Sequence, residues 1–186
     1  MIQKYVLTLM LFAMLLGCGS QGYYVLSSVP QPSHSYSSKR AIIGIEKVSV
    51  PAYLYKREIV VAKSSSQIIL LSGASWAEDL DAGLTHRLIG FIQKKFNNPN
   101  VHAYPWGSSK QPEFKVSLQV TRFIAQGNKV YLDANWQIEN INSEKHISKL
   151  FSNSVPTGQE ASQIVNAMDK AFKRLEEEIA KGLHQF

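Results

Sequence analysis

The chain has 186 residues, a formal net charge of +6 and a single cysteine, Cys18. Its length suits one domain with a substantial core and is short for two. The Lys and Arg residues are scattered in pairs without an aromatic-rich basic motif, so the composition argues against a nucleic-acid-binding protein.

Residues 1–17 have the pattern of a signal peptide. Lys4 supplies a positive n-region, and residues 5–16 form an apolar run that only Thr8 interrupts. The run is shorter than the roughly 20 residues that cross a bilayer core, so it is not expected to span a membrane. It ends in Leu-Leu-Gly-Cys at residues 15–18, which resembles a bacterial lipobox.

The lipobox resemblance implies cleavage before Cys18, a diacylglycerol on its sulfur and an acyl chain on the new amino terminus. Stable anchoring takes more than one acyl chain, which this cysteine would provide. The alternative, a lone buried cysteine, fits poorly with the end of an apolar leader. Residues 18–22 are then an acylated tether of at most about 14 Å, and residues 23–186 form the domain, held close to the leaflet.

The first part of the domain predicts short strands. β-forming residues 23–26 indicate a strand, and residues 29–40, with two prolines and four serines, an exposed loop. Residues 41–50 predict a second strand with Ile43, Ile45, Val48 and Val50 facing inward, ended by Pro51. Residues 51–61 indicate a turn that leads into another extended segment, and the apolar run 67–71 a buried strand.

A first helix is predicted from residue 75 to about residue 97. Ser75 and Glu78 have capping-box spacing, and the helix ends in Asn97-Asn98-Pro99-Asn100. One apolar stripe recurs at helical spacing: Leu80, Leu84, Leu88, Phe91, Ile92 and Phe96.

The second half of the chain predicts a meander and a closing helix. Residues 101–106 indicate a short strand, residues 114–123 and 130–138 an antiparallel hairpin, and residues 146–151 a third strand. Thr157 and Glu160 have capping-box spacing ahead of an apolar stripe from Ile164 to Leu183. The outer face of this helix is expected to hold ordinary ion pairs among Lys170, Lys173, Arg174, Glu176, Glu177 and Glu178.

Together these elements predict an α/β (α+β) fold: a single layered domain with a mixed sheet of six or seven strands, a C-terminal antiparallel meander and two long amphipathic helices.

The sequence contains no metal-binding, nucleotide-binding or hydrolase motif. Glu78, Asp79 and Asp81 lie together, but carboxylates at a helix start favour the positive end of the dipole, and His86 is expected on the surface. No catalytic residue, metal or cofactor is predicted, so the chain is not expected to be an enzyme.

The aromatic residues offer the other candidate site. Tyr and Trp suit surfaces that are half apolar and half wet. Trp136, on an alternating strand, is expected in the core. For Tyr53, Tyr55 and Trp106, near loops, a partner interface and the core remain equally open.

Several segments resemble the PqiC (YmbA) family, the lipoproteins that accompany PqiA and PqiB in an MCE-type transport system. They span most of the mature chain and are residues 23–26 (YYVL), 43–54 (IGIEKVSVPAYL), 57–60 (REIV), 76–80 (WAEDL) with Gly83, 101–106 (VHAYPW) and the strand 116–123. The resemblance implies an α/β domain like those of other transport-auxiliary lipoproteins. It carries over no catalytic residue, and only Cys18 as a defined position.

The resemblance further implies an outer-membrane lipoprotein on the periplasmic side that docks on a PqiB-like MCE protein and helps lipids pass between the inner and outer membranes. The resemblance implies that the MCE protein forms a tunnel and that this chain assembles into a homo-oligomer around the tunnel axis. A part in membrane integrity is implied as well. Gly19 after the cysteine, instead of Asp, agrees with outer-membrane sorting. The main alternative is a lipoprotein that assists assembly of an outer-membrane barrel; a periplasmic hydrolase is disfavoured by the motif search.

Overall fold

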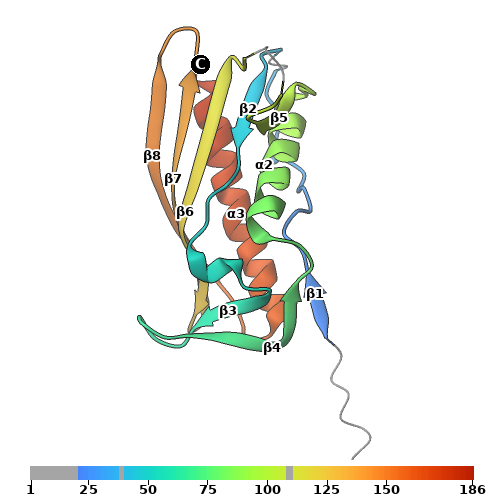
Figure 1. Cartoon of the computed structure of the whole chain (residues 1–186), viewed down its shortest axis with the longest axis vertical. Coiled ribbons are helices and arrows are strands. Elements are labelled where there is room, and N and C mark those ends of the chain that lie inside the picture. Colours follow the sequence, from blue (N-terminus) through green and yellow to red (C-terminus); the bar gives the residue numbers. More distant parts are fainter. Residues whose placement is uncertain (1–20, 38–39, 108–110) are drawn as a thin grey trace, which may run out of the picture.

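The chain folds into two layers, one mixed β-sheet and a pair of α-helices that cover one of its faces (Figure 1). The computed structural model describes residues 21–37, 40–107 and 111–186; the expected leader 1–17 and Cys18 lie outside this part. The elements, in chain order, are β1 (Gly22–Tyr24), β2 (Ile43–Glu46), the 3-10 helix η2 (Ala52–Tyr55), β3 (Glu58–Ala62), β4 (Ile68–Trp76), α2 (Leu80–Phe96), β5 (Val101–Tyr104), β6 (Phe114–Gln126), β7 (Lys129–Asn140), β8 (His146–Pro156) and α3 (Ala161–His184).

β6 runs through the centre of the sheet. β7 follows it in antiparallel register along its whole length, and β8 pairs with β7 in the same way. On its other side, β6 pairs with β2 near its start, where Ile43 lies opposite Phe114, and with β3 at its end, where Val61 lies opposite Ala125. β5 extends the sheet beyond β2, and β4 and β1 beyond β3. The predicted meander is confirmed, and the described residues form eight strands instead of six or seven.

The inward side chains of β6 and β7 are apolar and the outward ones, apart from Ile124, are polar, as alternation predicts. The less regular position of Phe123 has a structural cause. The register with β7 shifts between Val120 and Arg122, so that one extra residue returns Phe123 to the buried face. Trp136 is also buried, which confirms its predicted place in the core.

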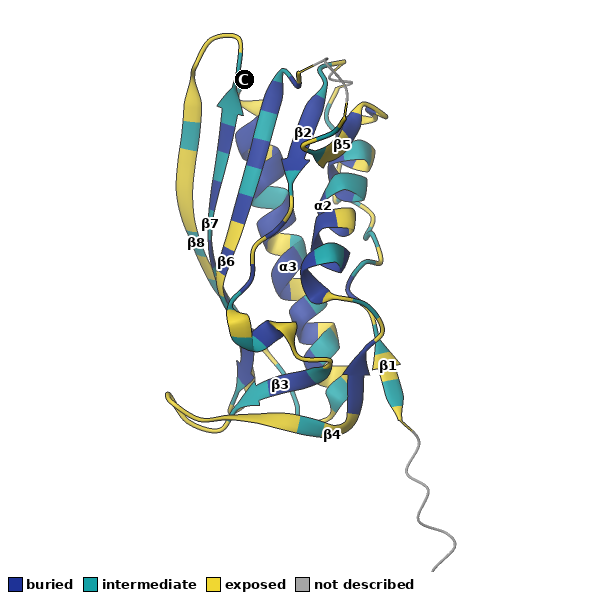
Figure 2. Ribbon diagram, in the orientation of Figure 1, coloured by how far each residue is buried: buried dark blue, intermediate teal, exposed yellow. Residues whose placement is uncertain are grey.

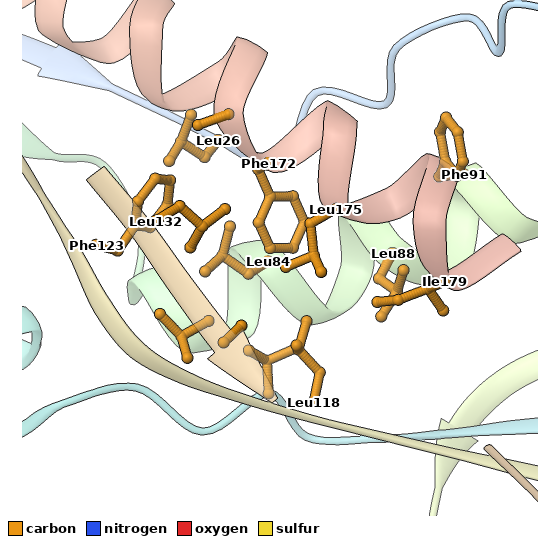
Figure 3. Packing of buried hydrophobic residues seen from close by; sticks show 14 of the residues in the cluster. Leu26, Leu84, Leu88, Phe91, Leu118, Phe123, Leu132, Phe172, Leu175 and Ile179 are labelled. Carbon is orange, nitrogen blue, oxygen red and sulfur yellow. The ribbon is translucent and has the colours of Figure 1, made fainter. Parts of the chain in front are cut away.

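The two helices bury their apolar stripes against the same face of the sheet. α2 packs on β2 and β5, whereas α3 packs mainly on β7 and β8. Figure 3 shows Leu84 of α2 beside Leu175 of α3, and Leu88 of α2 beside Ile179 of α3. Every predicted stripe residue of α2 is buried, and the helix ends, as predicted, where Asn97 adopts a left-handed conformation.

Both predicted capping boxes are wrong in position. Ser75 is part of β4, where it pairs with Glu58 of β3, so its backbone needs no cap and α2 begins only at Leu80. α3 begins with a capping box of Glu160 and Gln163. The predicted Thr157 is instead held by a bond from its backbone N–H to the carbonyl of Asn128 in the β6–β7 turn.

The strand predicted at residues 67–71 exists, but the prediction that it is buried is wrong. Ile68, Ile69 and Leu70 expose 45%, 43% and 47% of their surface. An uninterrupted apolar run is typical of a strand that is covered on both faces. In this fold that part of β4 projects past the helices, and neither face is fully covered (Figure 2).

A bend in β4 produces the projection. Residues 71–74 of β4 lie between two register positions that only Ile59 separates in β3, and Gly73 has a φ of 74°, which glycine adopts without strain. The turn 63–67 is closed by a bond from the Lys63 N–H to the carbonyl of Gln67 at 2.8 Å. We call β3, this turn and β4 the β3–β4 arm; it crosses the lower end of the molecule in Figure 1.

A buried charge cluster joins the two helices. Arg87 of α2 donates from Nε and Nη2 to the two carboxylate oxygens of Glu176 on α3, both at 3.1 Å, and from Nη1 to Asp169 at 2.6 Å. The side chains of Arg87 and Glu176 are fully buried. The expectation that Glu176 lies on the outer face of its helix is therefore wrong. Its neighbour Glu177 does pair at the margin, with Lys95 at 2.6 Å.

One guanidinium thus faces two carboxylates. Burial raises the pKa of Glu176 to about 7; Arg87 opposes this shift and Asp169 adds to it. The excess negative charge of the cluster is relieved when Glu176, its buried carboxyl group, takes up a proton.

We expect Gly182→Ala to destabilise the domain. The added Cβ would lie 2.5 Å from the ring of Trp136, which is buried and cannot move aside. Overpacking of this kind costs about 1–3 kcal/mol, of which the better helix propensity of Ala returns at most about 1 kcal/mol. Urea unfolding measures the difference. Gly107→Ala is the control, because nothing lies within 4 Å of its added Cβ; equal stability of both variants would contradict the close contact.

We expect Glu176→Gln to flatten the pH dependence of stability. Between pH 4.5 and about 7 the folded state holds a proton that the unfolded state has lost. The free energy of unfolding therefore falls as pH rises, by at most about 1.4 kcal/mol per pH unit, and the contribution is complete below pH 4.5. Urea unfolding from pH 5 to 8 should show this slope in the parent chain and not in the variant.

Glu177→Gln is the matched control for this slope. Although burial acts in the other direction, the bonds from Lys95 and Ser33 lower the pKa of Glu177. Its stabilisation is present above the unfolded pKa and is lost as pH falls below it, so the slope between pH 5 and 7 should persist. An equal slope in the parent chain and Glu176→Gln would show that Glu176 is not the group responsible.

Candidate functional surface

The two tyrosines singled out from the sequence both lie in η2 but differ in exposure. Tyr53 is half-buried, and its hydroxyl accepts a bond from the backbone N–H of Phe123 at 3.3 Å. Burial raises the pKa of Tyr53 above its ordinary value, against the effect of that bond. Tyr55 exposes 58% of its surface. Tyr53 therefore supports the sheet, while Tyr55 is free to meet another molecule.

Trp106 lies elsewhere, just after β5. Its ring stands edge-on to Tyr104, with centroids 5.3 Å apart, and to His102 at 6.2 Å. A Cβ on Gly44 of β2 would lie 3.1 Å from the Trp106 ring, so the indole packs directly on that strand. β5 ends beside Glu46, the last residue of β2, whereas the chain runs on along β6 through residues 47–51 before η2 begins. The structure therefore does not bring Trp106 together with Tyr53 and Tyr55 (Figure 1).

Among the carboxylates near the start of α2, Asp81 has partners that the structure shows, and these give it a structural role. Asp81 is buried, pairs with Lys47 at 2.7 Å and accepts the backbone N–H of Ala82 at 2.7 Å. This confirms that it supports the helix start. His86, one turn later, is exposed as expected.

Two searches of the described residues were negative. No group of three or more His, Asp or Glu side chains is placed to hold a metal ion. No helix in the same residues has the length and apolar composition needed to cross a membrane.

Sequence reasoning missed the buried charges, although a signal for them was present. Arg87 and Lys95 fall on the apolar stripe of α2, three or four residues from its leucines and phenylalanines, and Glu176 falls between Phe172 and Ile179 on the stripe of α3. Charges at such positions are buried and paired, or absent. Arg87 and Glu176 have no exposed surface, so this pair joins the helices inside the fold.

The β3–β4 arm carries three of the exposed large hydrophobic side chains of the described residues, Ile68, Ile69 and Leu70. Beside it runs an open groove whose lining includes Tyr53, Ser64, Ile68 and Arg122. The Arg122 guanidinium lies over the ring of Tyr131 at 4.1 Å and donates to Gln126 at 2.7 Å, so its position is fixed.

The described chain enters the fold next to this arm. β1 pairs in parallel with β4, with Gly22 opposite Ala74, and Gln21 donates to the Ser75 hydroxyl at 2.7 Å. Tyr23 exposes 64% of its surface and Val25 46%. Chain entry and exposed apolar side chains therefore share one end of the molecule (Figure 2).

Solved structures share this fold. A crystal structure of an uncharacterized protein is 20% identical and has a TM-score of 0.70, with 88% of this chain and 99% of that chain covered. A crystal structure of a protein from Xanthomonas campestris is 15% identical and has a TM-score of 0.66, with 87% and 90% covered. At these identities the likeness concerns the fold alone.

Sequence comparison identifies the family. The intermembrane transport lipoprotein PqiC of Escherichia coli (strain K12) is 27% identical over 128 residues, which cover 66% of this chain and 67% of that protein; the protein of the same name from Shigella flexneri matches equally. The family model of the ABC-type transport auxiliary lipoprotein component matches residues 24–180. The resemblance to PqiC found in the sequence is confirmed, and the chain belongs to the family of ABC-type transport auxiliary lipoprotein components.

Proposed function

We propose that the chain is an outer-membrane lipoprotein, acylated on Cys18, that docks on a PqiB-like MCE protein and assists the passage of lipids between the inner and outer membranes. The family match over residues 24–180 carries the proposal. The similarity to a protein named as an intermembrane transport lipoprotein supports the process. A part in membrane integrity follows from that process.

The entry of the chain supports an anchor at one end of the domain. Cys18 precedes Gly22 by four residues, which span at most about 14 Å. An acyl anchor on Cys18 therefore holds the end that carries β1 and the β3–β4 arm close to the leaflet. The β7–β8 turn and the C-terminus lie at the other end, where a partner that crosses the periplasm would arrive (Figure 1). Gly19 after Cys18 supports retention at the outer membrane.

The proposed function uses surfaces and no bond-breaking chemistry. Tyr55 is exposed and Trp106 forms part of an aromatic cluster at the edge of the sheet. Both remain candidate interface residues, for the MCE protein or for a second copy of the chain in a homo-oligomer around the tunnel. Tyr53 is the weakest of the three candidates, because its hydroxyl is engaged by the backbone of β6.

We expect Cys18→Ala to give an unacylated chain, either soluble or with its leader uncleaved, and to leave the fold intact. The variant lacks the sulfur that takes the diacylglycerol, while the described domain begins beyond this position. Detergent partitioning and the intact mass of the purified chain measure anchoring, and thermal unfolding measures the fold. Globomycin should block processing of the parent chain only. Unchanged partitioning of Cys18→Ala would contradict lipidation.

We expect an MCE protein to co-purify with the chain from detergent-solubilised envelopes. A tag in the exposed β6–β7 turn, at residues 127–128, leaves the end with the β7–β8 turn and the C-terminus untouched. Cys18→Ala with the same tag is the control for partners that require the anchor. Recovery of an outer-membrane barrel without an MCE protein would contradict the proposed partner and favour the barrel-assembly alternative.

A further inference from the structure

The β3–β4 arm presents three consecutive aliphatic side chains that the described residues cover only in part. Ile68, Ile69 and Leu70 are each close to half exposed. Successive side chains of a strand point to opposite faces, so both faces of the arm are open. An apolar strand segment with both faces exposed to solvent indicates a surface that contacts a membrane or another molecule.

The segment lies within reach of the proposed lipid anchor. Gly22 is opposite Ala74, and four residues separate it from Cys18, a span of at most about 14 Å. Leu70 is also four residues from Ala74, at most about 13 Å along β4. The bend at Gly73 turns this part of β4 across the end of the domain at which β1 begins (Figure 1).

The composition of the arm favours lipid over protein as its partner. The chain has no Asp or Glu between Glu58 and Glu78, and the charge within that interval is Lys63. A surface without carboxylates and with a cation approaches phosphate headgroups without repulsion.

We propose that Ile68–Leu70 lies in the headgroup–acyl boundary of the leaflet that holds Cys18, so that the domain meets the membrane at two points. This rests on the proposed lipidation. The unpaired backbone groups of β4 limit how deeply this segment enters the membrane. β3 satisfies one edge of this segment, through Val61 opposite Ile69, whereas β1 pairs with β4 only at residues 74–76. The other edge needs water or headgroups, which the hydrocarbon core lacks.

The proposal is tested with Ile69→Cys in the lipidated chain. Once the sulfur of Cys18 is in a thioether, the new thiol is the only one, because the sequence has a single cysteine. The chain is labelled with an environment-sensitive dye and inserted into vesicles of phosphatidylethanolamine and phosphatidylglycerol. We expect blue-shifted emission and strong quenching by lipid nitroxides. Leu150→Cys on β8 is the matched control, since Leu150 is an aliphatic residue with 88% exposure, and it should report water.

The outcomes separate the contact from the anchor. Intact mass shows whether the chain is acylated. If it is acylated but the dye at residue 69 emits like the dye at residue 150, the membrane contact is overturned and lipidation stands. A shift at residue 69 that grows with protein density at constant lipid would assign the arm to a second copy and also overturn it. A Cys18 found unacylated would overturn the anchor and, with it, the contact. Thermal unfolding of both labelled variants verifies the fold.

Discussion

The pairing of β6 on both of its edges is the constraint on which the rest of the structure depends. One edge is used along its full length by β7, whereas the other is shared between β2 at its start and β3 at its end. η2 connects β2 to β3 in the chain. Neither helix packs over the segment that follows β3. The helices therefore cover the sheet formed by β2 and β5–β8, while β3 and β4 extend past its end.

The relative position of the helices rests on a directional interaction as well as on apolar contacts. Apolar side chains pack in many arrangements with similar energy, but a guanidinium that donates to two carboxylates fixes both distance and rotation. Arg87 makes these bonds with no exposed surface. The cluster therefore fixes α2, which follows the β3–β4 arm in the chain, relative to α3.

Local patterns were sufficient for most of the secondary structure. The stripe of α2 and the alternation of β6 and β7 could be predicted because each depends on neighbours a few residues away. The exposure of Ile68 could not, because whether an apolar strand is covered depends on which distant element lies above it. The burial of Glu176 likewise depends on a partner 89 residues earlier in the chain. For the candidate interface, the sequence could not separate Tyr53, which the backbone of β6 engages, from the exposed Tyr55.

The direction of α3 has a consequence for the dimensions of any assembly that contains this domain. The helix has 24 residues, which corresponds to a length of about 36 Å. It begins beside the end at which the chain enters the fold and finishes at the opposite end (Figure 1). When the entry end is fixed to a surface, the helix acts as a rigid spacer. A protein from the facing membrane then has to bridge a gap that is shorter by the length of the helix.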